Sequence, residues 1–177
     1  RRANSERFAR IYPDRGANRG TVMESTPAPR TFVYGGEAVE HPVAYLPVFP
    51  GTNCDYDTAR AFRRAGAEVE TTVFCNLSAE AIFRSIREMK EHIRRCHIFV
   101  LSGGFSSGDE PDGSGKFIAN VLNNKDIAEE IHALLDRGGL ILGICNGFQA
   151  LVKSGLLPYG RLGCVTKDSP TLFRNDI

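Results

Sequence analysis

The residues best placed to do chemistry are Cys145 and the two glycines that stand two positions away on either side of it. The segment Gly143-Ile144-Cys145-Asn146-Gly147 follows an apolar run and precedes residues 148–153, which can form a helix. A nucleophile in such a strand-to-helix turn sits on a strained backbone, and close packing leaves room only for glycine at the flanking positions. The helix N-terminus also favours the thiolate, which is the form that attacks a carbonyl carbon. The pattern therefore predicts a cysteine nucleophile for acyl transfer.

Acyl transfer also requires hydrogen-bond donors for the oxyanion that forms on the substrate carbonyl. The turn supplies one donor, the backbone N–H of Asn146, because this residue follows the nucleophile. We expect the second donor to be the backbone N–H of Gly104, in the loop Ser102-Gly103-Gly104-Phe105-Ser106-Ser107-Gly108-Asp109. Loops that follow parallel strands leave the same edge of a sheet, so the two segments can meet there. Either glycine-rich segment alone could be an ordinary turn, whereas the two together favour a site.

The elements that would position these segments follow an α/β pattern from Val43 onward, in which short apolar runs alternate with longer amphipathic stretches. We predict a mainly parallel, open sheet with helices on both faces. The predicted strands are residues 43–49, 69–74, 97–101 and 140–144, the last two buried, and the predicted helices are residues 55–65, a segment capped by Ser78, residues 127–135 and residues 148–153. In the second helix, five apolar residues recur at three- and four-residue steps and should face the sheet: Ile82, Phe83, Ile86, Met89 and Ile93.

Composition and charge narrow the classes of function. The chain has 177 residues, of which 42% are hydrophobic and 24% are charged, and these values are typical of one globular domain. A formal net charge of +1 offers no strong field for nucleic acid or an anionic membrane. The sequence holds neither a run of about 18 apolar residues nor a secretory signal, so we expect a cytoplasmic location. Residues 1–42 lack an apolar period and are typical of a connector.

The other cysteines and the four histidines complete the set of reactive side chains. Five scattered cysteines without a CxxC pair argue against a disulfide framework and a metal site. Cys54 lies after the first strand, at the expected edge of the sheet, but no glycines flank it as they flank Cys145. The expected topology places no histidine within reach of Cys145, so a Cys–His pair is incomplete. Either the chain is inactive or its general base lies in downstream sequence, and we favour the second interpretation.

Three segments together resemble one known family. They are Pro50-Gly51-Thr52-Asn53-Cys54-Asp55, the loop from Ser102 to Asp109, and Gly143-Ile144-Cys145-Asn146-Gly147-Phe148-Gln149. Over about residues 43–175 they resemble the class I (triad) glutamine amidotransferase domain of phosphoribosylformylglycinamidine synthase. The resemblance implies a flavodoxin-like fold that is truncated at the C-terminus. It also implies that residues 1–42 connect to a preceding synthetase region and that residues 43–177 are the N-terminal part of the amidotransferase domain.

The same resemblance implies a reaction and a set of roles. Cys145 would attack the side-chain amide of glutamine, release ammonia and form a thioester that water hydrolyses. Gly104 and Asn146 would be the oxyanion donors and Gln149 a glutamine contact, while the family's catalytic His and Glu would lie beyond residue 177. This domain would need no cofactor, and ATP and magnesium would serve the synthetase, which converts formylglycinamide ribonucleotide to formylglycinamidine ribonucleotide. The expected partners are therefore glutamine and the synthetase, without nucleic acid or membrane, and the 177-residue chain alone should lack sustained glutaminase turnover.

Two other classes of function fit the same residues. A different cysteine hydrolase, or a DJ-1-like protein, could use the same turn for other acyl or aldehyde chemistry on a similar sheet. A non-catalytic module that docks onto the synthetase could carry the thiol incidentally. Labelling of Cys145 by a glutamine analogue distinguishes an amidotransferase from the first alternative. The effect of Cys145→Ala on glutamine-dependent synthesis distinguishes it from the second.

Overall fold

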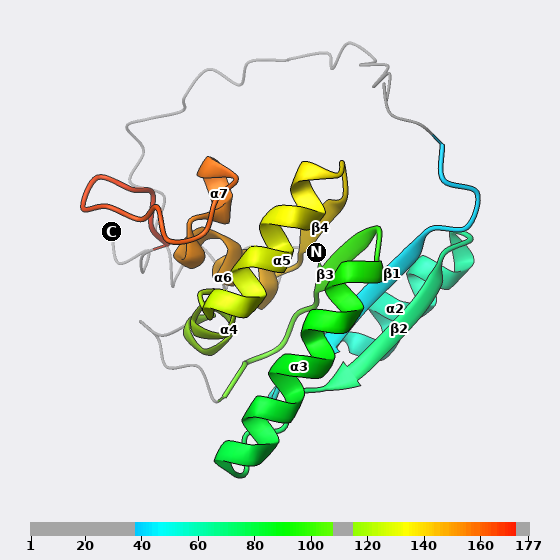
Figure 1. The fold of residues 1–177 in the computed structure, drawn as a ribbon, viewed down its shortest axis with the longest axis horizontal. Coiled ribbons are helices and arrows are strands. Elements are labelled where there is room, and N and C mark those ends of the chain that lie inside the picture. Colours follow the sequence, from blue (N-terminus) through cyan, green and yellow to red (C-terminus); the bar gives the residue numbers. More distant parts are fainter. Residues whose placement is uncertain (1–37, 108–114, 173–177) are drawn as a thin grey trace, which may run out of the picture. The chain divides into compact units, whose positions relative to one another are not determined.

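The computed structural model describes residues 38–107 and 115–172, and within them the strands form one parallel sheet (Figure 1). The strands are β1 (Val43–Val48), β2 (Glu68–Val73), β3 (Ile98–Leu101) and β4 (Leu140–Gly143). Their order is β2-β1-β3-β4, and each neighbouring pair is parallel. This is the strand order of flavodoxin-like sheets, whose ligands bind beyond the carboxyl ends of the strands. The predicted parallel α/β fold is confirmed.

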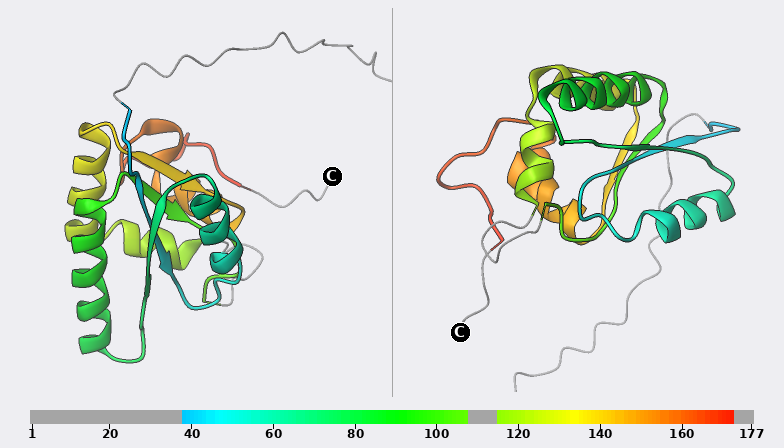
Figure 2. Two further views of the ribbon diagram at one scale, coloured as in Figure 1. Left: turned by 90° about the vertical axis from the view of Figure 1, so that its right-hand side faces the viewer. Right: turned by 90° about the horizontal axis from the view of Figure 1, so that it is seen from below.

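Helices lie on both faces of this sheet, as predicted. They are α2 (Asp55–Arg64), α3 (Ala79–Arg95), α4 (Lys116–Leu122), α5 (Lys125–Asp136), α6 (Asn146–Ser154) and α7 (Leu156–Tyr159). Figure 2 shows α3 and α5 side by side on one face and α2 on the opposite face. Helix α6 packs against β3, β4 and α4. The chain thus enters α6 directly from the carboxyl end of β4.

The apolar pattern of β1 and β3 explains why these two strands form the centre of the sheet. Tyr45 and Phe99 point to the face covered by α3 and α5, where they join the larger of two buried apolar clusters. Ala44, Leu46 and Val100 point to the other face, against Phe62 of α2. A parallel strand that is buried on both faces needs such a continuous apolar run. The prediction of a fully buried strand is therefore correct for β3.

The same prediction is wrong for β4. Leu140 is 46% exposed and Leu142 is 40% exposed, whereas Ile141 between them packs against the larger cluster. The physical reason is the position of β4 at the end of the strand order, where the described residues cover only one of its faces. An apolar run predicts a strand, but it does not tell a central strand from an edge strand.

Two predictions about helices also need correction. Met89 and Ile93 of α3 are buried as expected, but Phe83 is 67% exposed. Phe83 follows Ile82 directly and so lies about 100° further around the helix, outside the stripe that faces the sheet. Helix α4 was not predicted, because the glycine-rich segment before it indicates a long loop and the helix has only seven residues. Residues 1–37 of the connector predicted at residues 1–42, and loop residues Gly108 and Asp109, lie outside the described residues.

Candidate active site

Cys145 occupies the turn between β4 and α6 with an unusual backbone conformation. Its φ is 51° and its ψ is −106°, although it is not a glycine. Residues other than glycine adopt such a backbone conformation only at a cost in free energy, and such residues cluster at functional sites. The thiol is exposed. The structure therefore holds this cysteine in a strained turn at the start of a helix, as the sequence predicts.

The two glycines that flank Cys145 are explained by close packing. A Cβ atom on Gly147 would collide with the carbonyl oxygen of Leu101, the last residue of β3. A Cβ atom on Gly143 would lie 2.8 Å from the carbonyl group of Gly147 and 2.6 Å from the Leu151 side chain. Helix α6 thus approaches the ends of β3 and β4 so closely that neither position has room for a side chain.

A second loop, from Ser102 onward, runs beside the nucleophile. A Cβ atom on Gly103 would lie 3.4 Å from the Cβ atom of Cys145 and 3.6 Å from the Sγ atom of Cys54. Gly104 has a φ of 136°, and a Cβ atom there would lie 2.5 Å from the Gly51 carbonyl oxygen. Within residues 38–107 and 115–172, the Gly104 N–H donates no hydrogen bond. This backbone donor therefore remains available beside the turn of Cys145.

The loops after β1 and β3 are joined by backbone hydrogen bonds, which sequence reasoning did not anticipate. Thr52 and Gly104 form an isolated antiparallel bridge. The Phe105 N–H donates to the Gly51 carbonyl at 2.9 Å, and the Asn53 N–H donates to the Gly103 carbonyl at 3.3 Å. Because β1 and β3 are neighbours in the sheet, their loops leave it side by side. The Pro-Gly-Thr-Asn turn thus supports the loop that carries Gly104.

Asn146 and Gln149 lie in the first turn of α6, next to the nucleophile. The Gln149 N–H donates to the Cys145 carbonyl at 3.0 Å. The Asn146 side chain, which is buried to 2% exposure, accepts a hydrogen bond from the Ser106 N–H at 3.3 Å. It also donates from Nδ2 to Oε1 of Gln149 at 3.2 Å. The structure therefore brings Cys145, Gly104, Asn146 and Gln149 together at one edge of the sheet.

The remaining cysteines differ in their surroundings. Cys54 is exposed, and its thiol donates to Oδ1 of Asn53 at 3.1 Å. Cys96, at the end of α3, is buried in the larger apolar cluster, and this burial raises the pKa of its thiol to about 11. Cys75 is half-buried and Cys164 is exposed. Cys54 therefore lies at the same edge of the sheet as Cys145, and Gly103 is close to both residues.

Three of the four histidines are engaged away from Cys145. His92 pairs with Glu70 and stacks on Tyr45. His97 accepts from the Val43 N–H at 3.0 Å, which places it at the amino ends of β1 and β3. His132 of α5 accepts from the Leu162 N–H at 3.0 Å. The fourth, His41, is exposed just before β1.

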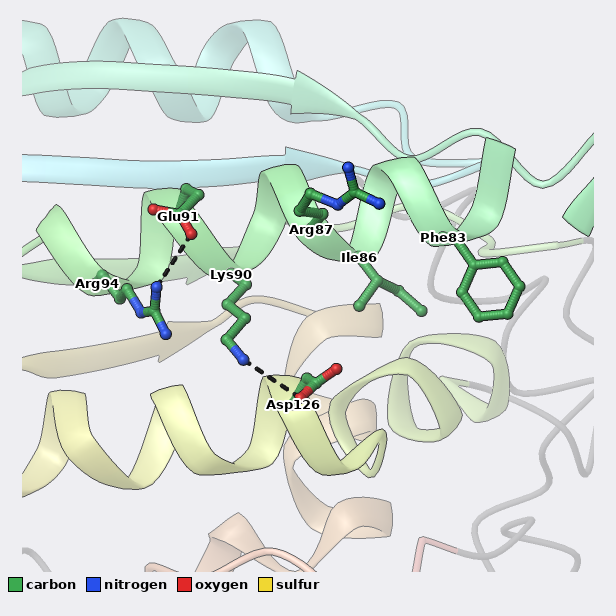
Figure 3. Close-up of a pocket in the computed structure, with 7 residues that line it drawn as sticks. All are labelled: Phe83, Ile86, Arg87, Lys90, Glu91, Arg94 and Asp126. Atoms are coloured by element: carbon green, nitrogen blue, oxygen red, sulfur yellow. Dashed lines mark hydrogen bonds and ion pairs between the residues drawn. The ribbon is translucent and has the colours of Figure 1, made fainter. Parts of the chain in front are cut away.

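A groove between α3 and α5 is a separate surface feature (Figure 3). Its charged side chains largely pair with one another, as Lys90 does with Asp126 at 3.2 Å and Arg94 with Glu91 at 3.0 Å. In the described part of the chain, no cluster of three His, Cys, Asp or Glu residues could hold a metal ion. The helices in these same ranges are too short or too polar for any of them to cross a membrane.

Comparison with known proteins shows the family to which the chain belongs. The family profile of the CobB/CobQ-like glutamine amidotransferase domain matches residues 41–177, and the chain belongs to this family. The curated subunit PurQ of phosphoribosylformylglycinamidine synthase from Dehalococcoides mccartyi is 42% identical over 109 residues, covering 62% of this chain and 38% of that protein. The PurQ subunit from Pyrococcus furiosus is 38% identical over 111 residues, covering 63% of this chain and 41% of that protein. The resemblance found in the sequence is thereby confirmed.

Among solved structures, that of PurLQS from Thermotoga maritima is 34% identical in sequence, with a TM-score of 0.45. The match covers 66% of this chain and 46% of that chain. The chain spans about two fifths of the length of the curated relatives that it matches.

Proposed function

We propose that this chain carries the nucleophile of a glutaminase, in a protein that supplies ammonia to phosphoribosylformylglycinamidine synthase. The observation that carries this proposal is the strained turn of Cys145 at the start of α6, beside the loop of Gly104. Membership of the amidotransferase family and the similarity to PurQ subunits of phosphoribosylformylglycinamidine synthase support this substrate and this pathway.

The proposed reaction begins when the Cys145 thiolate attacks the side-chain amide carbon of glutamine. The carbonyl oxygen then becomes an oxyanion, and the backbone N–H groups of Gly104 and Asn146 would stabilise it. When this intermediate collapses, the C–N bond breaks, the nitrogen takes up a proton and leaves as ammonia, and a thioester to Cys145 remains. Water hydrolyses the thioester to glutamate and restores the thiol. The general base for these proton transfers would lie outside the described residues.

The released ammonia would serve a synthetase that works with this chain. ATP and magnesium would be used there, to convert formylglycinamide ribonucleotide to formylglycinamidine ribonucleotide, and we propose no cofactor for the amidotransferase part. A cytoplasmic location suits this activity, because all five cysteines are free and a catalytic thiol must stay reduced.

An electrophilic glutamine analogue tests the proposal. The complete protein would be treated with the analogue, and the adduct mapped by peptide mass spectrometry. We expect the adduct on Cys145 and protection by excess glutamine. Cys54→Ser is the matched control, because Cys54 is the other exposed thiol at this edge, and it should leave the labelling unchanged. An adduct on Cys54 alone, or labelling by other acyl donors but not by the glutamine analogue, would overturn the proposal.

A second experiment separates catalysis from docking. Cys145→Ala in the complete complex should abolish glutamine-dependent synthesis and leave ammonia-dependent synthesis intact, since only the source of ammonia is lost. If the variant keeps both activities, the thiol is incidental and the chain is a docking module.

A further inference from the structure

The side chain of Asn146 is buried at the centre of the candidate site and needs an explanation of its own. A residue that follows the nucleophile can offer its backbone N–H to an oxyanion whatever its side chain. The amide of Asn146 is nevertheless almost completely buried and hydrogen-bonded on both sides, to Ser106 and to Gln149. Burying an amide is favourable only when such partners are present. Part of its role therefore lies in what the bonds to Ser106 and Gln149 fix.

The bond with Ser106 determines which way the Asn146 amide faces. A backbone N–H can only donate, so the atom that meets the Ser106 N–H at 3.3 Å must be the oxygen Oδ1. The nitrogen Nδ2 therefore faces Gln149, where it can only donate. The atom of Gln149 that meets it at 3.2 Å must in turn be the oxygen Oε1. A backbone donor in one loop thus sets the orientation of two side-chain amides in sequence.

The consequence is that Gln149 presents a hydrogen-bond donor. With Oε1 occupied by Asn146, the group that remains is the Nε2 amide, which has no partner among the described residues. Gln149 is half-buried and lies one helical turn from Cys145. The Nε2 amide of Gln149 suits an acceptor on the substrate, such as a carboxylate or a carbonyl oxygen.

We infer that Asn146 is a positioning residue for substrate specificity, because its side chain holds Gln149 as a donor toward the oxygen atoms of glutamine. This inference rests on the proposed glutaminase function and deepens it. Asn146 also joins the start of α6 to the loop of Gly104 through Ser106. One side chain thereby sets both the orientation of the substrate contact and the position of the loop that carries an oxyanion donor.

The variant Asn146→Asp tests the orientation directly. Its carboxylate still accepts from the Ser106 N–H, but the second oxygen can only accept, so Gln149 must turn its Nε2 toward residue 146 and its oxygen outward. In the complete complex we expect the KM for glutamine to rise about tenfold or more, since a donor is replaced by an acceptor. We expect a smaller change in kcat. The rate of Cys145 alkylation by iodoacetamide, which needs no glutamine contact, should change less than the KM.

A double-mutant cycle with Gln149→Met distinguishes this role from a merely structural one. Methionine is similar in length but has no amide, so Asn146 has nothing to orient in that background. We expect Gln149→Met alone to raise the KM, and Asn146→Asp to add little to it, because the two effects share one interaction. Asn124→Asp is the matched control: Asn124 caps α5 by accepting from the Asp126 N–H at 3.1 Å, and the same substitution there should leave the KM unchanged.

Each outcome decides between the alternatives. If Asn146→Asp leaves the KM unchanged, or raises it equally in the Gln149→Met background, the inference is overturned while the glutaminase function stands. If the unmodified complex neither hydrolyses glutamine nor takes the glutamine label on Cys145, the proposed function fails and the inference fails with it.

Discussion

At the scale of single residues, the candidate site depends on positions where a side chain is either indispensable or impossible. Cys145 carries the reactive atom on a backbone with positive φ, and Gly147 permits the close approach of α6 to β3. The Asn146 side chain accepts from the Ser106 N–H in the loop after β3 and donates to Gln149 in α6. Neighbouring residues of one turn thus have three separate physical reasons for their identity.

Gly147→Ala should disrupt the turn, because its Cβ atom would collide with backbone that has no freedom to move. We expect a loss of about 3 kcal/mol in stability and loss of glutamine hydrolysis. Gly138→Ala is the control: nothing lies within 4 Å of its Cβ position, so only its positive φ, which Gly147 does not share, should lower the stability, by about 1 kcal/mol. Urea unfolding and a glutaminase assay check both variants, and equal losses would contradict the packing argument.

Cys96 should be protected from alkylation at pH 8, where the exposed thiols of Cys54 and Cys145 react. Burial raises its pKa to about 11, against 9.0 for the ordinary thiol. Between pH 9 and 11 the unfolded thiol loses its proton while the folded one keeps it, so the stability present below pH 9 is lost as the pH approaches 11. Labelling of Cys96, followed by mass spectrometry, should accelerate across that range. Rapid labelling at pH 8 would show that the site is open.

At the scale of elements, the fold was more predictable than the contacts within the site. Alternating apolar runs and amphipathic stretches are sufficient to predict the strands, most helices and the edge where Cys145 and Gly104 meet. The bridge between Thr52 and Gly104 follows from the strand order, which the sequence does not state. The hydrogen bond of the Asn146 side chain with Ser106 could not be predicted, because the two residues are 40 positions apart in the chain. Phe83 shows that an apolar residue beside a buried stripe need not join it.

The bridge between the two loops can be tested at Phe105. Its side chain is 68% exposed, while its backbone N–H donates to Gly51. Phe105→Pro removes that donor and should lower glutamine hydrolysis by about tenfold or more, because the loop of Gly104 loses its support. Phe105→Ala keeps the donor and should retain most of the activity. Similar activities for the two variants in a glutaminase assay would show that the bridge is dispensable.

At the scale of the whole described part, hydrogen bonds join residues that are far apart in the chain. His132 in α5 accepts from the N–H of Leu162, a residue in the segment after α7. His132→Ala should leave this partly buried N–H without its acceptor and lower the stability by about 1–2 kcal/mol. Hydrogen exchange of the Leu162 amide is the sensitive measurement, and the amides of β1 serve as the reference. Unchanged protection of Leu162 would mean that this hydrogen bond does not fix the segment.

The positive φ of Cys145 separates what folding favours from what catalysis requires. Glycine adopts such a backbone conformation without strain, so Cys145→Gly should unfold at a higher temperature than Cys145→Ala, although both variants lack the thiol. At position 145, the residue that gives the backbone least strain is therefore one that lacks the reactive thiol. The molecule gives up stability at a single residue, the one at which the proposed glutaminase requires a sulfur atom.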